Sequence, residues 1–170
     1  MNNKYNIALL PVSQSKLAVE YAQKFSLISH RYLLGASSMP HVTLYQFYAN
    51  EAELQNIWNN VGQLLEPKSI ILSLDGFRSL TYDDSLYWAS LMPNNHEGLH
   101  SMHAIVAKAI NKPVYDNYDP HMTLMNTNNK DCEKIVNDML KSYKPFQDRF
   151  IPALGKCDDM GQFTEVVYKA

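Results

Sequence analysis

Two copies of the sequence Pro-His-x-Thr-Leu, at residues 40–44 and 120–124, contain the residue types in this chain that are best suited to chemistry. Successive side chains of a β-strand point to opposite faces, so the His and the Thr of each copy share one face. The apolar residues share the other face, which a core can bury. One copy alone would indicate an ordinary strand, but the repeated pattern favours a function. Metal-free acid–base chemistry at phosphorus needs two imidazoles and two hydroxyls, which here are His41, Thr43, His121 and Thr123.

A second candidate is His96-Glu97-Gly98-Leu99-His100, which matches the HExxH pattern of zinc hydrolases. On a helix the two His would bind zinc and the Glu would polarise a water molecule, and His103 falls on the same face. However, a glycine inside a helix costs about 1 kcal/mol, and two Asn residues just before His96 indicate that the helix only begins there. We therefore expect this segment to pack as an ordinary helix, and zinc hydrolysis stays as an alternative function.

The pattern of apolar residues predicts the strands and helices that would position the two motifs. Strands are expected at 5–12, 41–48, 68–77, 85–92, 121–126, 148–157 and 162–169, and helices at 17–28, 54–65, 96–110 and 135–143. Turns are expected around Tyr82-Asp83-Asp84 and Asp158-Asp159-Met160-Gly161.

This order of elements repeats when the chain is shifted by about eighty residues, which places His41 on His121. We interpret residues 1–170 as a single domain of two repeats, about 1–92 and 93–170. A pseudo-two-fold axis that pairs equivalent strands would set the two His residues across one groove.

Composition narrows the range of partners. The chain has 170 residues, 46% of them hydrophobic, and a formal net charge of −2. It has only three arginines, Arg31, Arg78 and Arg149, and no basic stripe of the kind that binds long nucleic acid. A small or terminal nucleotide is therefore the expected partner, rather than a duplex.

The cysteines and the apolar runs bear on the location of the protein. Cys132 and Cys157 are the only cysteines and have no metal-binding spacing, which indicates free thiols in a reducing compartment. The apolar patch at 7–12 is too short for a signal peptide, and no run approaches the length of about 18 apolar residues that a membrane span requires. We expect a soluble, cytoplasmic monomer with no membrane partner.

The two motifs, PHVTL and PHMTL, resemble the paired His-x-Thr signatures of the two-histidine (2H) phosphoesterase superfamily, which includes RNA 2′,3′-cyclic phosphodiesterases and 2′-5′ RNA ligases. The opening segment 5–11 is also similar to the first strand of such proteins. The resemblance implies a bilobal α+β domain, with antiparallel sheets lining a central groove and helices packed outside, and no metal or other cofactor. Several RNA-directed members carry an arginine just after the second motif, where this chain has Met125 and Asn126. The cation that binds phosphate is thus unassigned.

The expected function is a metal-independent phosphodiesterase that hydrolyses a cyclic or 2′-linked nucleotide phosphate. His41 and His121 would exchange protons with the reacting groups, and Thr43 and Thr123 would bind the phosphate oxygens. Tyr45 would share their face in a regular strand and stack on a base or ribose. Three alternatives remain: a phosphodiesterase for cyclic di- or oligonucleotides, a non-catalytic nucleotide- or RNA-binding module, and a zinc hydrolase that uses His96 and His100.

Overall fold

The computed structural model describes residues 2–81 and 85–170 and contains every strand and helix that the sequence predicts. The predicted turn at Tyr82-Asp83-Asp84 lies outside the described residues. The strands are β1 (Asn3–Pro11), β2 (Val42–Ala49), β3 (Ile70–Thr81), β4 (Tyr87–Pro93), β5 (Met122–Thr127), β6 (Phe146–Cys157) and β7 (Phe163–Lys169). The helices are α1 (Ser15–Gln23), α2 (Leu54–Leu64), which a short 3₁₀ turn at Glu51–Glu53 precedes, α3 (His96–Ala109) and α4 (Cys132–Leu140).

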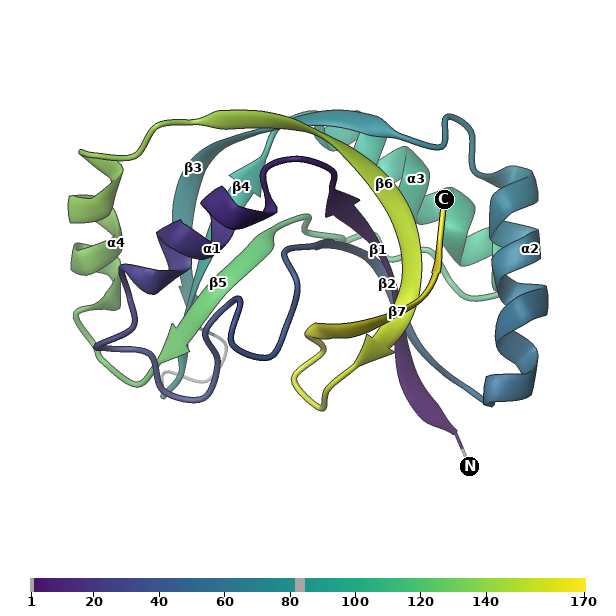
Figure 1. Cartoon of the computed structure of the whole chain (residues 1–170), viewed down its shortest axis with the longest axis horizontal. Helices are drawn as coiled ribbons and strands as arrows, with labels where there is room; N and C mark the ends of the chain where they lie inside the picture. The colour runs from purple at the N-terminus through teal and green to yellow at the C-terminus, as the bar shows by residue number, and fades with distance from the viewer. Residues whose placement is uncertain (1, 82–84) are drawn as a thin grey trace.

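All seven strands belong to one antiparallel sheet, in the order β2-β1-β6-β3-β4-β5, with β7 paired to β6. The predicted α+β class with antiparallel strands is thereby confirmed, although the strands form one continuous sheet and not separate sheets. The sheet bends into an arch, so its two ends approach each other (Figure 1). The strand at each end, β2 or β5, is the one that begins directly after a motif His.

The helices gather at the two ends of the arch (Figure 1). α3 packs on β2 and against α2, while α1 packs on β5 and α4 packs on β3 and β4. Each end of the sheet is therefore covered partly by a helix from the other half of the sequence. Within the described part of the chain, no helix is both long enough and apolar enough to span a membrane.

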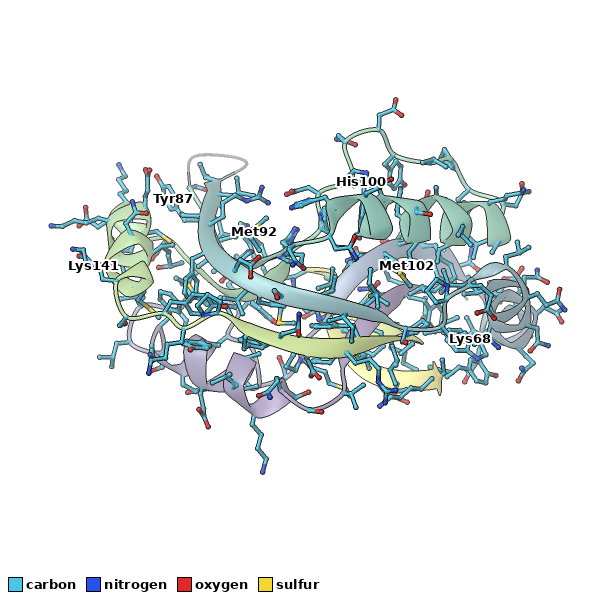
Figure 2. The ribbon with its side chains drawn as sticks, turned by 90° about the horizontal axis from the view of Figure 1, so that it is seen from above. Lys68, Tyr87, Met92, His100, Met102 and Lys141 are labelled. Carbon is cyan, nitrogen blue, oxygen red and sulfur yellow. The ribbon has the colours of Figure 1, made fainter. Side chains whose placement is uncertain are left out.

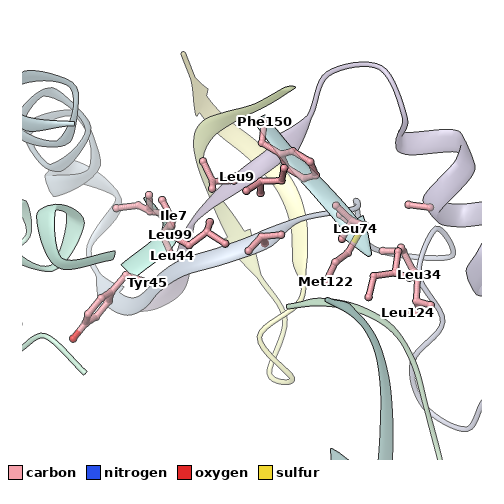
Figure 3. Close-up of a cluster of buried hydrophobic side chains, with 14 of the residues drawn as sticks. Ile7, Leu9, Leu34, Leu44, Tyr45, Leu74, Leu99, Met122, Leu124 and Phe150 are labelled. Atoms are coloured by element: carbon pink, nitrogen blue, oxygen red, sulfur yellow. The ribbon is translucent and has the colours of Figure 1, made fainter. Parts of the chain in front are cut away.

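The core forms around strand β1, whose residues Tyr5–Pro11 are all buried. A strand covered on both faces reads as a continuous apolar run, and this run does so except at Asn6. Leu44 and Leu124, the last residues of the two motifs, are 1% and 0% exposed. Figure 3 shows Leu44 beside Ile7 and Leu99, and Leu124 beside Leu34. The apolar face of each motif thus anchors its strand in the core.

A segment that leads into β2 closes the arch by pairing with β5. The amide of His30 donates to the carbonyl of Asn126 (2.8 Å), and the amide of Asn126 donates to the carbonyl of Tyr32 (3.1 Å). The amide of Leu34 donates to the carbonyl of Leu124 (2.8 Å). The chain then runs directly into the first motif. This pairing ties the strand that carries the second motif to the segment that carries the first.

Candidate functional site

A cavity of about 440 Å³ lies where the two ends of the sheet approach each other. We call it the motif cavity, because residues of both Pro-His-x-Thr-Leu copies line it: His41, Thr43, Leu44, His121 and Thr123. Leu80 of β3 and Trp88 and Ser90 of β4 form one wall. The remaining lining comes from Tyr45, Gln46, His103, Tyr115, Tyr118, Asp119 and residues 160–162. The structure therefore brings together the four residues that the sequence selected for phosphorus chemistry.

Each motif imidazole is held by the main-chain carbonyl two residues before it. Nδ1 of His41 lies 2.7 Å from the carbonyl oxygen of Met39, and Nδ1 of His121 lies 2.8 Å from that of Asp119. A carbonyl oxygen can only accept, so Nδ1 carries the hydrogen in both rings and Nε2 is left as the reactive nitrogen. The proline between carbonyl and His restricts the backbone on both sides of it, which keeps the carbonyl turned toward the ring.

The two imidazoles have different surroundings. His41 is 5% exposed, and its ring centroid lies 5.8 Å from that of Phe163. Burial lowers the pKa of His41 to about 4, against the opposing effect of its hydrogen bond to Met39. The side chain of His121 is 32% exposed, and the Asp119 carboxylate lies 3.7 Å from its Nδ1. Burial also lowers the pKa of His121, whereas the hydrogen bond and the negative charge of Asp119 act to raise it.

The hydroxyl of Thr43 is oriented by Asn6, a fully buried residue of β1. Nδ2 of Asn6 donates to Oγ1 of Thr43 at 2.9 Å, so the hydroxyl hydrogen of Thr43 is free to donate into the motif cavity. Thr123, the equivalent residue of the second motif, is 6% exposed. Sequence reasoning missed Asn6 because it lies far from the motif in the chain, although one polar residue inside an apolar strand is a signal that could have found it.

Both motif strands contain a β-bulge at the same motif position. Along β1 the pairing skips from Tyr45 to Thr43, and along β4 it skips from Met125 to Thr123. The extra residue is therefore the Leu of the motif in each case. Bulges next to active sites redirect side chains, and here they place the third residue after each Thr on the same face as that Thr. The shared bulge supports the proposed duplication.

In a regular strand Tyr45 would share the face of His41 and Thr43. The bulge explains why it does not. Tyr45 pairs with Ile7, whose side chain faces the core. Tyr45 is 3% exposed, and its ring lies against those of His103 (5.5 Å between ring centroids) and Tyr115 (5.0 Å), which also lie against each other (5.7 Å). The Tyr45 hydroxyl donates to the carbonyl of Pro113 at 3.0 Å. Tyr45 thus supports an aromatic wall of the motif cavity, and its own ring faces are covered.

The residues on the same face as each Thr, three positions further on, fix neighbouring segments. Nε2 of Gln46 donates to the carbonyl of Gly161 at 2.7 Å, and this bond holds the β6–β7 turn against the motif cavity. Oδ1 of Asn126 accepts from the amides of Arg31 and Tyr32, each at 2.9 Å. The β6–β7 turn borders the motif cavity, and residues 31–32 belong to the segment that leads into the first motif. The two bulges therefore also help to fix the surroundings of the cavity.

The HExxH segment forms the first turns of α3, which begins at His96 behind the N-cap Asn95. His96 and His100 are exposed, and Figure 2 shows His100 on the side of α3 opposite to Met102, which faces the sheet. His103 is buried, with Nδ1 2.7 Å from the carbonyl of Leu44 and Nε2 accepting from the amide of Tyr115 at 3.1 Å. Within the described residues, no three His, Cys, Asp or Glu side chains are grouped so that they could hold a metal ion.

A family model for the 2′-5′ RNA ligase superfamily matches residues 14–162. A comparison with curated proteins gives no significant sequence match. Among solved structures, E. coli LigT in complex with 3′-AMP has a TM-score of 0.62 and 12% sequence identity, covering 99% of this chain and 96% of LigT. A structure described as a phosphoesterase has a TM-score of 0.63 and 10% identity, covering 100% and 98% of the two chains. Kluyveromyces marxianus Usb1 has a TM-score of 0.52 and 18% identity, covering 96% and 95%.

The chain belongs to the 2′-5′ RNA ligase superfamily, because the family model spans most of its length. The likeness to LigT and to the other solved structures extends over the whole chain and shows a shared fold. The expected membership of the 2H phosphoesterase superfamily is therefore confirmed. Membership of this family supports an enzymatic activity on nucleotide phosphates.

Proposed function

We propose that this protein is a metal-independent phosphodiesterase that hydrolyses a cyclic or 2′-linked nucleotide phosphate with His41 and His121 as its acid–base pair. The observation that carries this proposal is the arrangement of the two rings: both line one cavity, and both have Nδ1 bound to a carbonyl so that Nε2 is left for reaction. A phosphate at this site would lie within reach of the Thr43 hydroxyl, which Asn6 leaves free to donate.

The different surroundings of the two rings assign their roles. His41 is buried and neutral over most of the pH range, so its Nε2 accepts a proton from the attacking water. The water oxygen forms a bond to phosphorus, and the bond from phosphorus to the ribose oxygen breaks. His121, which lies beside the Asp119 carboxylate, gives its Nε2 proton to that leaving oxygen. Thr43 and Thr123 stabilise the charge that develops on the non-bridging oxygens.

The size and lining of the motif cavity support a single nucleotide as the bound unit. A volume of about 440 Å³ lies in the range of small-ligand sites. Trp88 and Tyr118 line it and offer flat surfaces on which a base can stack. The neighbouring LigT structure was solved with 3′-AMP, a nucleotide that a 2′,3′-cyclic phosphodiesterase can release. These features favour a small cyclic or terminal phosphate over a duplex.

A substrate panel assayed in EDTA tests the proposal. The panel contains a 2′,3′-cyclic mononucleotide, a 2′-5′-linked dinucleotide, a cyclic dinucleotide and a long single-stranded RNA. We expect turnover of the cyclic mononucleotide or the 2′-5′ linkage that EDTA does not reduce, with unchanged rates in His96→Ala. Activity that is lost on chelation and restored by Zn²⁺ would instead identify a zinc hydrolase. Binding without turnover would identify a nucleotide-binding module. Turnover of the cyclic dinucleotide alone would identify a phosphodiesterase for cyclic di- or oligonucleotides.

The pH dependence of kcat/KM is expected to be bell-shaped, with its maximum on the acidic side of neutrality. His41 must be neutral to accept a proton, so activity rises as the pH passes about 4. His121 must be protonated to donate, and its pKa is lowered from the usual 6.5, so activity falls again as the pH approaches neutrality. Initial rates at low substrate concentration from pH 3.5 to 9 measure both limbs. A maximum at pH 7 or above would contradict this assignment of roles.

A further inference from the structure

Arg78 emerges from β3 on the face of the sheet that lines the motif cavity. In the sheet register Arg78 pairs with Ser90, and Ser90 pairs with Thr123. Side chains of directly paired residues lie on the same face, so Arg78 stands in one row with a motif threonine, two strands away. Its side chain is 32% exposed, and its Nε is buried without a hydrogen-bond partner among the described residues.

The guanidinium of Arg78 is bound by Asp119. Nη2 of Arg78 donates to Oδ2 of Asp119, in an ion pair across 41 positions of the sequence. Asp119 also contacts His121 twice: the Asp119 carbonyl accepts from Nδ1 of the ring, and Oδ2 of Asp119 lies 3.7 Å from that nitrogen. Asp119 is thus held from one side by a strand of the sheet and contacts the second motif His on the other.

No such arrangement surrounds the first motif His in the described structure. Nδ1 of His41 is bound by the carbonyl of Met39, whose side chain carries no charge, and the carboxylate that acts on the His41 pKa belongs to Asp158, in the β6–β7 turn. The charged groups that act on His121 are Asp119 on its own loop and Arg78 from β3, and His41, directly before β2, is the imidazole that interacts with it. Apart from the imidazoles, Asp119 is the one residue among the described lining of the cavity that carries a formal charge, and Tyr118 beside it is neutral.

We propose that Arg78 is a positioning residue: by holding Asp119 in place, it fixes the His121 ring with Nε2 toward the motif cavity and makes His121 the proton donor of the pair. The assignment of the donor rests on the function proposed above. A planar guanidinium bound to a carboxylate restrains that carboxylate more strongly than a flexible ammonium can. Its positive charge also balances the carboxylate, so that a phosphate is not repelled from the cavity.

The charges of Arg78 and Asp119 should shift the titration of His121 in opposite directions. Asp119→Asn removes a negative charge beside the ring but keeps the main-chain carbonyl, so the pKa of His121 should fall. Arg78→Met removes a positive charge that acts on the same ring, so the pKa of His121 should rise. Each shift is expected to be about half a unit to one unit, because the site is partly exposed. His41 should titrate as in the parent protein in both variants.

The test is an NMR titration of the imidazole nitrogens in the whole protein, combined with the pH profile of kcat/KM. The titration needs no substrate, so it reports whether both charges act on His121 even if the proposed activity is absent. We expect the basic limb of the profile to move up in Arg78→Met and down in Asp119→Asn, with an unmoved acidic limb. We also expect Arg78→Met to lower kcat by about tenfold or more, with a smaller change in KM, because the donor is less well oriented.

Lys141→Met is the matched control, because Lys141 forms an exposed ion pair with Asp138 on α4 and does not line the motif cavity. It should change neither the titration of His121 nor the rate. Arg78→Lys keeps the positive charge but loses the planar guanidinium, so it should keep the parent pKa of His121 and lower kcat in part. This variant also provides the test if Arg78→Met does not fold. The proposal would be overturned if the His121 titration and the pH profile of Arg78→Met matched those of the parent protein. If only Arg78→Lys folds, a kcat equal to that of the parent protein would overturn it. Opposite shifts in a protein that hydrolyses nothing in the panel would show that both charges act on His121 and would refute the function.

Discussion

Replacing either His41 or His121 with Ala is expected to lower kcat/KM by at least about a hundredfold, because positioned proton transfer contributes that much or more. Both rings line the motif cavity, and each presents Nε2 as its only free nitrogen. The double variant should lose far less than the product of the two single losses, since the base and the acid act in one step. Initial rates on the best substrate of the panel measure all three variants.

His30→Ala is a suitable control for this experiment. His30 is exposed and lies beside β5, and its hydrogen bond to Asn126 joins main-chain atoms only. The control should keep the parent rate, which would show that loss of an imidazole is harmful only at the motif cavity. A single His41→Ala or His121→Ala variant that is folded and turns over substrate at the parent rate would refute the acid–base assignment.

The second large effect is expected at Gly155, where a side chain has no room. A Cβ at this position in β6 would lie 2.1 Å from the carbonyl oxygen of Glu165 and 2.3 Å from the ring of Phe163. The oxygen is main chain in the paired strand β7, so it cannot move without loss of that pairing. We expect Gly155→Ala to lower the free energy of unfolding by about 3 kcal/mol or more, which for a chain of this length corresponds to roughly 10 °C in Tm.

Gly62→Ala is the matched control for Gly155→Ala. Gly62 is exposed in α2, and a Cβ there would meet nothing within 4 Å. Alanine is the better helix former, so this variant should gain about 0.5–1 kcal/mol. Urea unfolding followed by circular dichroism measures both changes. If Gly155→Ala unfolds at the same urea concentration as the parent, β6 and β7 are not packed as closely as the structure has them.

The strands and helices could be predicted because their signals are local. Alternating or continuous apolar residues mark β1, β2 and β5, and the helical spacing marks α2 and α3. The four motif residues could also be predicted, since two identical patterns at equivalent places of a repeat are visible without a structure. The ends of the elements differ from the predictions by a few residues, and α1 ends earlier, at Gln23.

The details that complete the candidate site depend on contacts between distant parts of the chain. Nothing in the residue types of Leu44 or Leu124 signals a bulge, because the extra residue is defined only against the partner strand. For that reason Tyr45 does not lie on the face of Thr43, where a regular strand would place it. Asn6 and Arg78 were also missed as contacts of the motifs, since their partners are set by strand order. Strand order, in turn, is not visible in the periodicity of a single sequence.

The position of β6 has a consequence for how the protein is made. This strand pairs with β1 along one part of its length and with β3 along another, so it joins the two ends of the arch. Both motifs leave the ribosome before β6 does, because residues 146–157 follow them in the sequence. Until then, β1 and β3 have no strand between them, and pairing across such long sequence separations forms slowly. A nascent chain that already holds all four motif residues therefore lacks the strand that joins β1 to β3, and we expect the motif cavity to form only after β6 has been synthesised.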